Sequence, residues 1–164
     1  MTAFWQFFLP LFAAGFAAAI IAGRIGFRGD RLRRSLACGA AAALAFTLLW
    51  DGPLGAAGRF AATVEHEARF VLDDWEMPAV SGHLQRAPLT RRLELSGPAD
   101  NFQRRELAKL MSLVPGVGRA SWSRDRAIPL VIEAAVTALL GFLLGLMLAY
   151  FIELRRRHNA QWSW

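Results

Sequence analysis

The sequence predicts a membrane α-helical protein, with three transmembrane helices and a small α+β domain outside the membrane. The chain has 164 residues, of which 55% are hydrophobic, a larger share than an ordinary soluble domain contains. It includes three apolar stretches of about the length needed to cross a hydrocarbon core. Most charged residues gather at the ends of these stretches and in one segment between the second and the third. This arrangement favours a membrane-anchored domain over a single soluble one.

The first transmembrane helix is predicted at residues 1–23, which include no charged side chain. At 1.5 Å per residue this helix is about 35 Å long, and the hydrocarbon core is about 30 Å thick. Phe4, Trp5, Phe7 and Phe8 suit the aromatic belt at a membrane interface. They also stand where a signal peptide would carry positive charge, so we expect this segment to be retained rather than cleaved.

Residues 24–34 are predicted to form a short basic loop, in which Asp30 is the single acid. By the positive-inside rule such a loop lies in the cytoplasm. Because it stands directly between two apolar stretches, we expect its arginines to meet anionic lipid headgroups rather than nucleic acid. These candidates for lipid contact are Arg24, Arg28, Arg31, Arg33 and Arg34.

The second and third transmembrane helices are predicted at residues 35–57 and 128–153. The third carries Pro129 where a first helical turn accepts proline. A tail at residues 154–164 follows, and we expect its arginines to meet lipid headgroups in the cytoplasm. These are Arg155, Arg156 and Arg157. Since both basic clusters belong in the cytoplasm, the N-terminus and residues 59–126 are expected on the opposite side.

Residues 59–126 are predicted to form the extramembrane domain. They include 11 basic and 9 acidic residues, as an ordinary solvated surface does. Apolar residues recur at helical spacing from Phe60 to Trp75, which predicts an amphipathic helix. A short strand is expected at residues 80–86. At under 70 residues this domain can bury only a small core of its own.

The best-patterned part of this domain is residues 93–122. Leu93 and Leu95 alternate with polar residues, which suits a strand with one buried face. Asp100 and Gln103 are spaced as a variant of the capping box that opens a helix. The apolar stripe of this helix is Leu107, Leu110, Met111 and Val114.

The turns that flank this helix resemble those of a BON domain, a small module of the bacterial envelope. Leu95-Ser96-Gly97 resembles the strand end that precedes the helix, and Pro115-Gly116-Val117 resembles the start of the last strand, expected at residues 117–122. The sequence departs from the pattern at Gly118-Arg119-Ala120, where a second Val or Ile is usual. The resemblance implies a BON-like fold and a non-catalytic module that binds phospholipid or protein at a membrane.

Small residues one helical turn apart occur in each predicted span. Gly141 and Gly145 form a GxxxG pair in the third span. In the first span Gly15 precedes Ala19, and in the second Gly39 precedes Ala43, at the same spacing. Such residues let two helix backbones approach closely in lipid. Two alternatives remain open: the glycines pack the chain's own helices together, or they contact another membrane protein.

Glu133 is the single charge from Ile128 to Ile152, the apolar run of the third predicted span. It lies about one turn after Pro129, near the headgroups and near the positive end of the helix dipole. We expect an interfacial carboxylate that is paired with Arg126 or Arg59. The alternative is a hydrogen bond to a partner subunit.

A second basic group lies in the extramembrane domain and could meet lipid phosphates. Its members are Arg91, Arg92, Arg104, Arg105 and Lys109. Nearby acids leave a mixed surface as the alternative. Cys38 is the single cysteine, so an internal disulfide is excluded, and its apolar neighbours predict a buried thiol. We find no catalytic constellation and no motif for a metal or a cofactor.

The sequence therefore predicts a non-enzymatic anchor or adaptor in the bacterial inner (cytoplasmic) membrane. Its N-terminus and residues 59–126 would lie in the periplasm, and its C-terminus in the cytoplasm. Expected partners are membrane lipids and another integral membrane protein or complex, and no nucleic acid. The alternative function is an accessory subunit of a large respiratory or photosynthetic complex, docked through its transmembrane helices.

Overall fold

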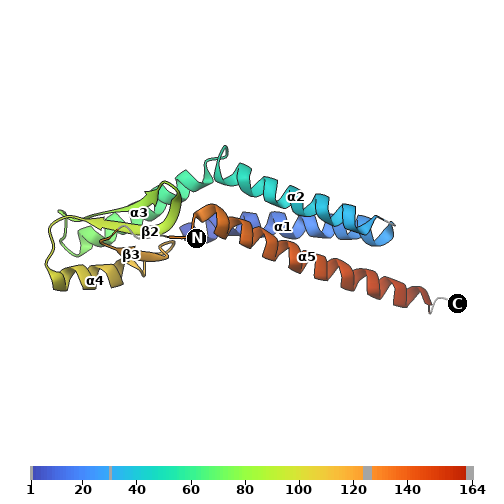
Figure 1. The fold of residues 1–164 in the computed structure, drawn as a ribbon. Helices are drawn as coiled ribbons and strands as arrows, with labels where there is room; N and C mark the ends of the chain where they lie inside the picture. Colours follow the sequence, from blue (N-terminus) through green and yellow to red (C-terminus); the bar gives the residue numbers. More distant parts are fainter. Residues whose placement is uncertain (1, 30, 124–126, 162–164) are drawn as a thin grey trace. The chain divides into compact units, whose positions relative to one another are not determined.

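The computed structural model describes residues 2–29, 31–123 and 127–161. The described chain is mostly helical and carries one small three-stranded sheet (Figure 1). It divides into two compact units. We call Met1–Phe7 with Gly55–Glu133 the mixed unit, because it holds the sheet, and Phe8–Leu54 with Ala134–Trp164 the helical unit.

Three described helices are long and apolar enough to cross a membrane, in the three regions where the sequence predicts spans. They are α1 (Ala3–Arg28), α2 (Leu32–Asp51) and α5 (Leu130–Gln161). Each is apolar along most of its length. The uncharged stretches seen in the sequence therefore form the helices that their length requires.

The ends of these helices differ from the predicted boundaries. Helix α1 continues through Arg24 and Arg28, so the basic segment at 24–34 is largely helical rather than a loop. Arginine is a good helix former, and a helix need not end where its apolar residues end. Helix α5 likewise runs into the predicted tail, where Glu153 pairs with Arg157 at 3.2 Å, four residues on.

The second span is shorter than the predicted 35–57. Helix α2 ends at Asp51, and a turn that contains Pro53 follows. Ala56 and Ala57 instead begin the next helix, α3 (Ala56–Asp74), and are buried there. The prediction was wrong here because an apolar composition alone does not separate a span from the buried start of an adjoining helix.

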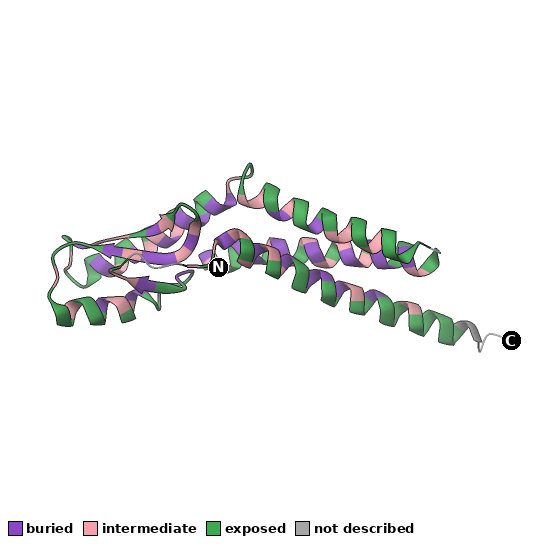
Figure 2. Cartoon of the chain, viewed as in Figure 1, coloured by how far each residue is buried: buried purple, intermediate pink, exposed green. Residues whose placement is uncertain are grey.

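The three helices of the helical unit meet at Ala19, Ala43 and Phe142, one residue from each helix. Buried residues recur among exposed ones along α1 and most of α5, whereas the first half of α2 is exposed or half-buried (Figure 2). Cys38 in α2 is exposed, so the predicted buried thiol is wrong. The described buried residues of α2 are Ala43 and Thr47, which lie one turn apart on one side of the helix, and Cys38 is not on that side.

The sheet of the mixed unit consists of β1 (Ser81–Arg86), β2 (Leu89–Ser96) and β3 (Arg119–Ser121), in that order. Strands β1 and β2 are antiparallel, and β3 joins β2 in parallel through α4 (Asn101–Met111). Helix α3 packs against β1 and helix α4 against β3. The strand and helix order expected over residues 93–122 is therefore present.

The apolar stripe of α3 forms much of the core of the mixed unit. Phe60, Val64, Ala68 and Leu72 are all buried, as their spacing predicts. Trp75, the last residue of the predicted stripe, is instead 58% exposed. It caps the C-terminus of α3, beyond the last helical residue, where helical spacing no longer sets the direction of a side chain.

Helix α4 begins as its capping residues predict. The Asp100 carboxylate accepts hydrogen bonds from the backbone N–H groups of Phe102 (2.9 Å) and Gln103 (2.7 Å). The Gln103 side chain accepts one in return from the Asp100 backbone N–H at 3.0 Å. This reciprocal pair satisfies donors that a helix N-terminus leaves unpaired.

Two glycines allow tight turns between the strands and helices of the mixed unit. Gly97 and Gly116 have φ angles of 132° and 104°, which side-chain-bearing residues rarely adopt. A Cβ on Gly116 would lie 2.6 Å from a methyl carbon of Val64. The turn after α4 can therefore lie directly on the core side of α3 because residue 116 lacks a side chain.

Candidate functional site

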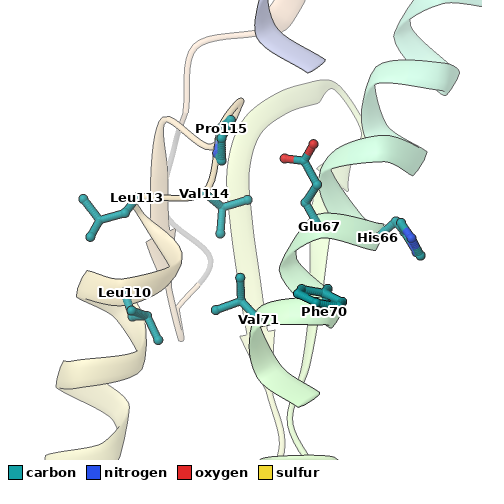
Figure 3. A pocket seen from close by; sticks show the side chains of 8 residues that line it. All are labelled: His66, Glu67, Phe70, Val71, Leu110, Leu113, Val114 and Pro115. Atoms are coloured by element: carbon teal, nitrogen blue, oxygen red, sulfur yellow. The ribbon is translucent and has the colours of Figure 1, made fainter. Parts of the chain in front are cut away.

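An apolar groove runs between α3 and α4 in the mixed unit. It consists of two adjoining hollows of about 500 and 510 Å³. Leu110 and Leu113 line both, so the groove is continuous. Figure 3 shows the first hollow, in which Phe70 and Val71 of α3 face the residues that end α4. The second hollow is lined largely by Trp75, Met77, Phe102 and Leu107. We call this surface the α3/α4 groove.

Large apolar side chains are unusually open to solvent along this groove. Phe70 is 71% exposed, Phe102 68% and Leu113 78%, and Trp75 is also more than half exposed. Single exposed apolar residues are common, but several gathered on one surface mark an interaction site. The sequence-based prediction placed no binding site here, because the residues come from two helices about 30 positions apart.

The groove has few polar side chains, and they differ in whether they are paired. One carboxylate oxygen of Glu67, Oε2, is buried and has no hydrogen bond among the described residues. Glu67 projects from α3 beside Pro115 (Figure 3). In the second hollow Glu106 and Lys109 pair with each other at 2.8 Å.

The basic group predicted in the extramembrane domain separates into two parts. Arg91 and Arg92 lie on β2, whereas the remaining members lie on α4. On α4, Arg104 stacks on the ring of Trp122 at 5.3 Å, and Lys109 pairs with Glu106. Arg105 donates to the backbone oxygen of Asn101 at 3.2 Å. The α4 members therefore form part of a mixed surface, which was the alternative interpretation.

On β2 the two arginines are held firmly. Arg91 donates to the backbone oxygen of Gly116 and to Glu133, each at 3.0 Å, and its guanidinium lies 5.0 Å from the centre of the Phe4 ring. Glu133 is thus paired with Arg91, which is not one of the two arginines that the sequence led us to expect as its partner. Of the two arginines expected to pair with it, Arg126 lies outside the described residues.

The glycines predicted to pack helices lie against the chain's own helices. A Cβ on Gly15 would lie 2.0 Å from the backbone oxygen of Ala138, and one on Gly141 would lie 2.2 Å from that of Phe12. The corresponding distance for Gly145 is 2.4 Å, to the backbone oxygen of Phe16. These glycines therefore join α1 to α5 at backbone distance.

Gly39 of α2 takes part in the same packing. A Cβ there would lie 2.6 Å from the Cβ of Ala22 in α1 and 3.1 Å from the Phe142 ring of α5. Packing within the chain, the first of the two alternatives, therefore describes these contacts. A partner helix that used the same surfaces would first have to displace α1 from α5.

The two basic clusters meet at one end of the helical unit. A guanidinium nitrogen of Arg157 in α5 donates to the backbone oxygen of Phe27 in α1 at 3.4 Å. The arginines at the end of α1, around the start of α2 and at the end of α5 are exposed. They are Arg24, Arg28, Arg31, Arg33, Arg34, Arg155, Arg156 and Arg157.

Among the described residues, no three His, Cys, Asp or Glu side chains gather as metal ligands. Comparison with known proteins gives no match to a family model, a curated protein or a solved structure.

Proposed function

We propose that this protein is a non-enzymatic adaptor of the bacterial inner membrane. Three helices anchor it, and its mixed unit faces the periplasm while both basic ends lie in the cytoplasm. The contact between Arg157 and Phe27 supports this orientation, because it brings the two basic clusters to the same end of the helical unit. The β2–α4–β3 order over residues 89–121 is consistent with a BON-like domain in the mixed unit.

The α3/α4 groove is the proposed binding surface, and its occupant is an amphipathic helix of a protein partner. The exposed side chains of Phe70, Trp75, Phe102 and Leu113 are the observation that carries this proposal. From Phe102 to Met111 the groove follows about 14 Å of α4 at helical rise, which suits two to three turns of a docked helix.

Site-specific photocrosslinking in cells that express the full chain tests this function. Benzoylphenylalanine at position 113 is expected to form an adduct with one membrane-associated protein, and the matched position 105 on the outer side of α4 is not. Phe102→Ser should remove the adduct, because it deletes a neighbouring anchor in the groove. Absence of a protein adduct at position 113, or equal adducts at both positions, would contradict the proposal.

The second candidate function is an accessory subunit that docks through its spans, and one feature of α2 favours it. Ala37, Ala41 and Ala45 recur at helical spacing and are all exposed, so a partner helix could approach closely there. If this surface is used, Ala41→Leu should release a co-purifying membrane complex in mild detergent, while Leu113→Ser should leave it bound. If Leu113→Ser releases the complex and Ala41→Leu leaves it bound, the α3/α4 groove is favoured instead.

A further inference from the structure

The α3 side of the α3/α4 groove is acidic. Helix α3 carries four carboxylates, which are Glu65, Glu67, Asp73 and Asp74. Glu67 and Phe70 both line the groove (Figure 3). Asp74 follows Glu67 by seven residues, which places the two carboxylates on the same side of the helix. We call Glu67 and Asp74 the acidic wall.

The four carboxylates of α3 differ in whether they have a cationic partner. Glu65 pairs with Arg86 at 2.8 Å, and Asp73 pairs with Arg69 at 3.1 Å. Neither member of the acidic wall forms an ion pair within the described part of the chain. The carboxylates that lie on the groove side of α3 are therefore the two that the chain itself does not neutralise.

The position of Asp74 adds to the negative charge at one end of the groove. Helix α3 ends at Asp74, and its last turn contains no basic residue. The C-terminus of a helix already carries a partial charge of about −0.5, so an acid there is unfavourable and a nearby cation is favourable. Folding of α3 alone would favour a basic residue at this position, whereas a cation from a binding partner would be stabilised by both the carboxylate and the helix end.

The charges on the α4 side of the groove compensate one another. The other Asp, Glu, Lys or Arg side chains that line the two hollows are Glu106 and Lys109, and they pair at 2.8 Å. The charge without a partner in the groove is therefore negative and lies along α3. A helix bound between α3 and α4 would meet apolar side chains below it and the acidic wall along one flank.

The spacing of the acidic wall fits a second helix. Glu67 and Asp74 are about 10 Å apart along α3, which is about two helical turns. A helix that lies alongside α3 can meet both carboxylates if its own cationic side chains are also seven residues apart. Phe70 and Val71 lie between the two carboxylates in the sequence and line the groove, so apolar residues of the bound helix would come between its cations.

We propose that the helix bound in the α3/α4 groove is basic, with two Lys or Arg side chains two turns apart that pair with Glu67 and Asp74. Its apolar stripe packs against Phe70 and Leu113. This inference rests on the proposed function, because it gives the chemistry of the partner that the groove binds. The acidic wall supplies specificity, since an acidic helix of equal hydrophobicity would be repelled.

Photocrosslinking from position 113 of the full chain, in cells, tests the charge of the partner. Asp74→Lys is expected to lower the yield of the adduct about fivefold, because it replaces an attraction by a repulsion. The matched variant Asp73→Lys makes the same change of charge one residue away, outside the acidic wall, and should leave the yield close to that of the parent. Asp74→Glu keeps the charge and should retain the adduct.

The outcomes separate this inference from the proposed function. If the parent forms no adduct, the proposed function is overturned, and this inference with it. If the parent forms an adduct and the yields in Asp74→Lys and Asp73→Lys are equal, the basic character of the partner alone is overturned. If circular dichroism shows that either lysine variant is misfolded, Asp74→Asn and Asp73→Asn replace the pair.

The adduct itself gives a second, independent measurement. Tandem mass spectrometry of the crosslinked peptide should identify a segment of the partner with an apolar helical stripe and two Lys or Arg residues seven positions apart. A crosslinked segment that is acidic or uncharged would overturn the inference even if the yields change as expected.

Discussion

Replacement of Gly141 with alanine probes the contact that joins α1 to α5. The new Cβ would lie 2.2 Å from the backbone oxygen of Phe12 and 3.0 Å from its carbonyl carbon. Ordinary contacts between carbon and a carbonyl oxygen are about 3.3 Å or longer. The two helices must therefore separate by about 1 Å, because the atom that is struck belongs to a backbone and cannot rotate away.

The expected loss of stability follows from this displacement. Overpacking of a well-packed contact costs about 1–3 kcal/mol. Gly145→Ala should cost a similar amount, because its Cβ would lie 2.4 Å from the backbone oxygen of Phe16. The two sites share one helix pair, so the double variant should lose less than the sum of the two single losses.

Reversible unfolding by sodium dodecyl sulfate in mixed micelles, followed by circular dichroism, measures these losses. The matched control is Leu140→Ala, which changes a neighbouring side chain that is 53% exposed, and it should cost no more than about 0.5 kcal/mol. If Gly141→Ala were as stable as this control, the close packing of α1 on α5 would be refuted.

Three other substitutions test the mixed unit. Asp100→Ala should lower the free energy of unfolding by about 1 kcal/mol through loss of the helix cap, and restoration by Asp100→Ser in thermal melts would confirm the cause. Gly116→Ala should lower the free energy of unfolding by about 1–3 kcal/mol, because residue 116 has a positive φ and its new Cβ would clash with Val64. The control Gly58→Ala lies at an open helical position and should be neutral or stabilising in the same melts. Glu133→Gln should cost about 1 kcal/mol by weakening the partly exposed pair with Arg91, and a loss that does not shrink in 1 M salt would argue against an ionic cause.

Local patterns in the sequence were sufficient for much of the fold. The uncharged stretches predicted the three spans, since a helix must satisfy its own backbone hydrogen bonds in lipid. The Asp100–Gln103 spacing predicted the start of α4 because capping depends on residues three apart. The strand at 80–86 and the helix from Phe60 were also present, within a few residues of their predicted limits.

The remaining features depend on contacts between distant residues, which periodicity does not report. Thr90 and Arg92 are buried in β2 although both are polar. The Arg92 side chain donates to Ser121 and to Ser123, and the Thr90 hydroxyl bonds to the Gln85 side chain. The two sides of the α3/α4 groove, at Phe70 and Leu113, come from α3 and from the turn that follows α4. The small residues around Gly141 were compatible with internal packing or with a partner, and only the path of α1 decides between them.

The side of the membrane on which the mixed unit lies is the central claim, and cysteine accessibility tests it most directly. In a Cys38→Ser background, single cysteines at Ser112 and His158, both exposed, are treated with a membrane-impermeant maleimide in intact spheroplasts. We expect labelling at position 112 before permeabilisation and at position 158 only afterwards. Labelling in the opposite order, or at both positions in intact spheroplasts, would contradict the proposed topology.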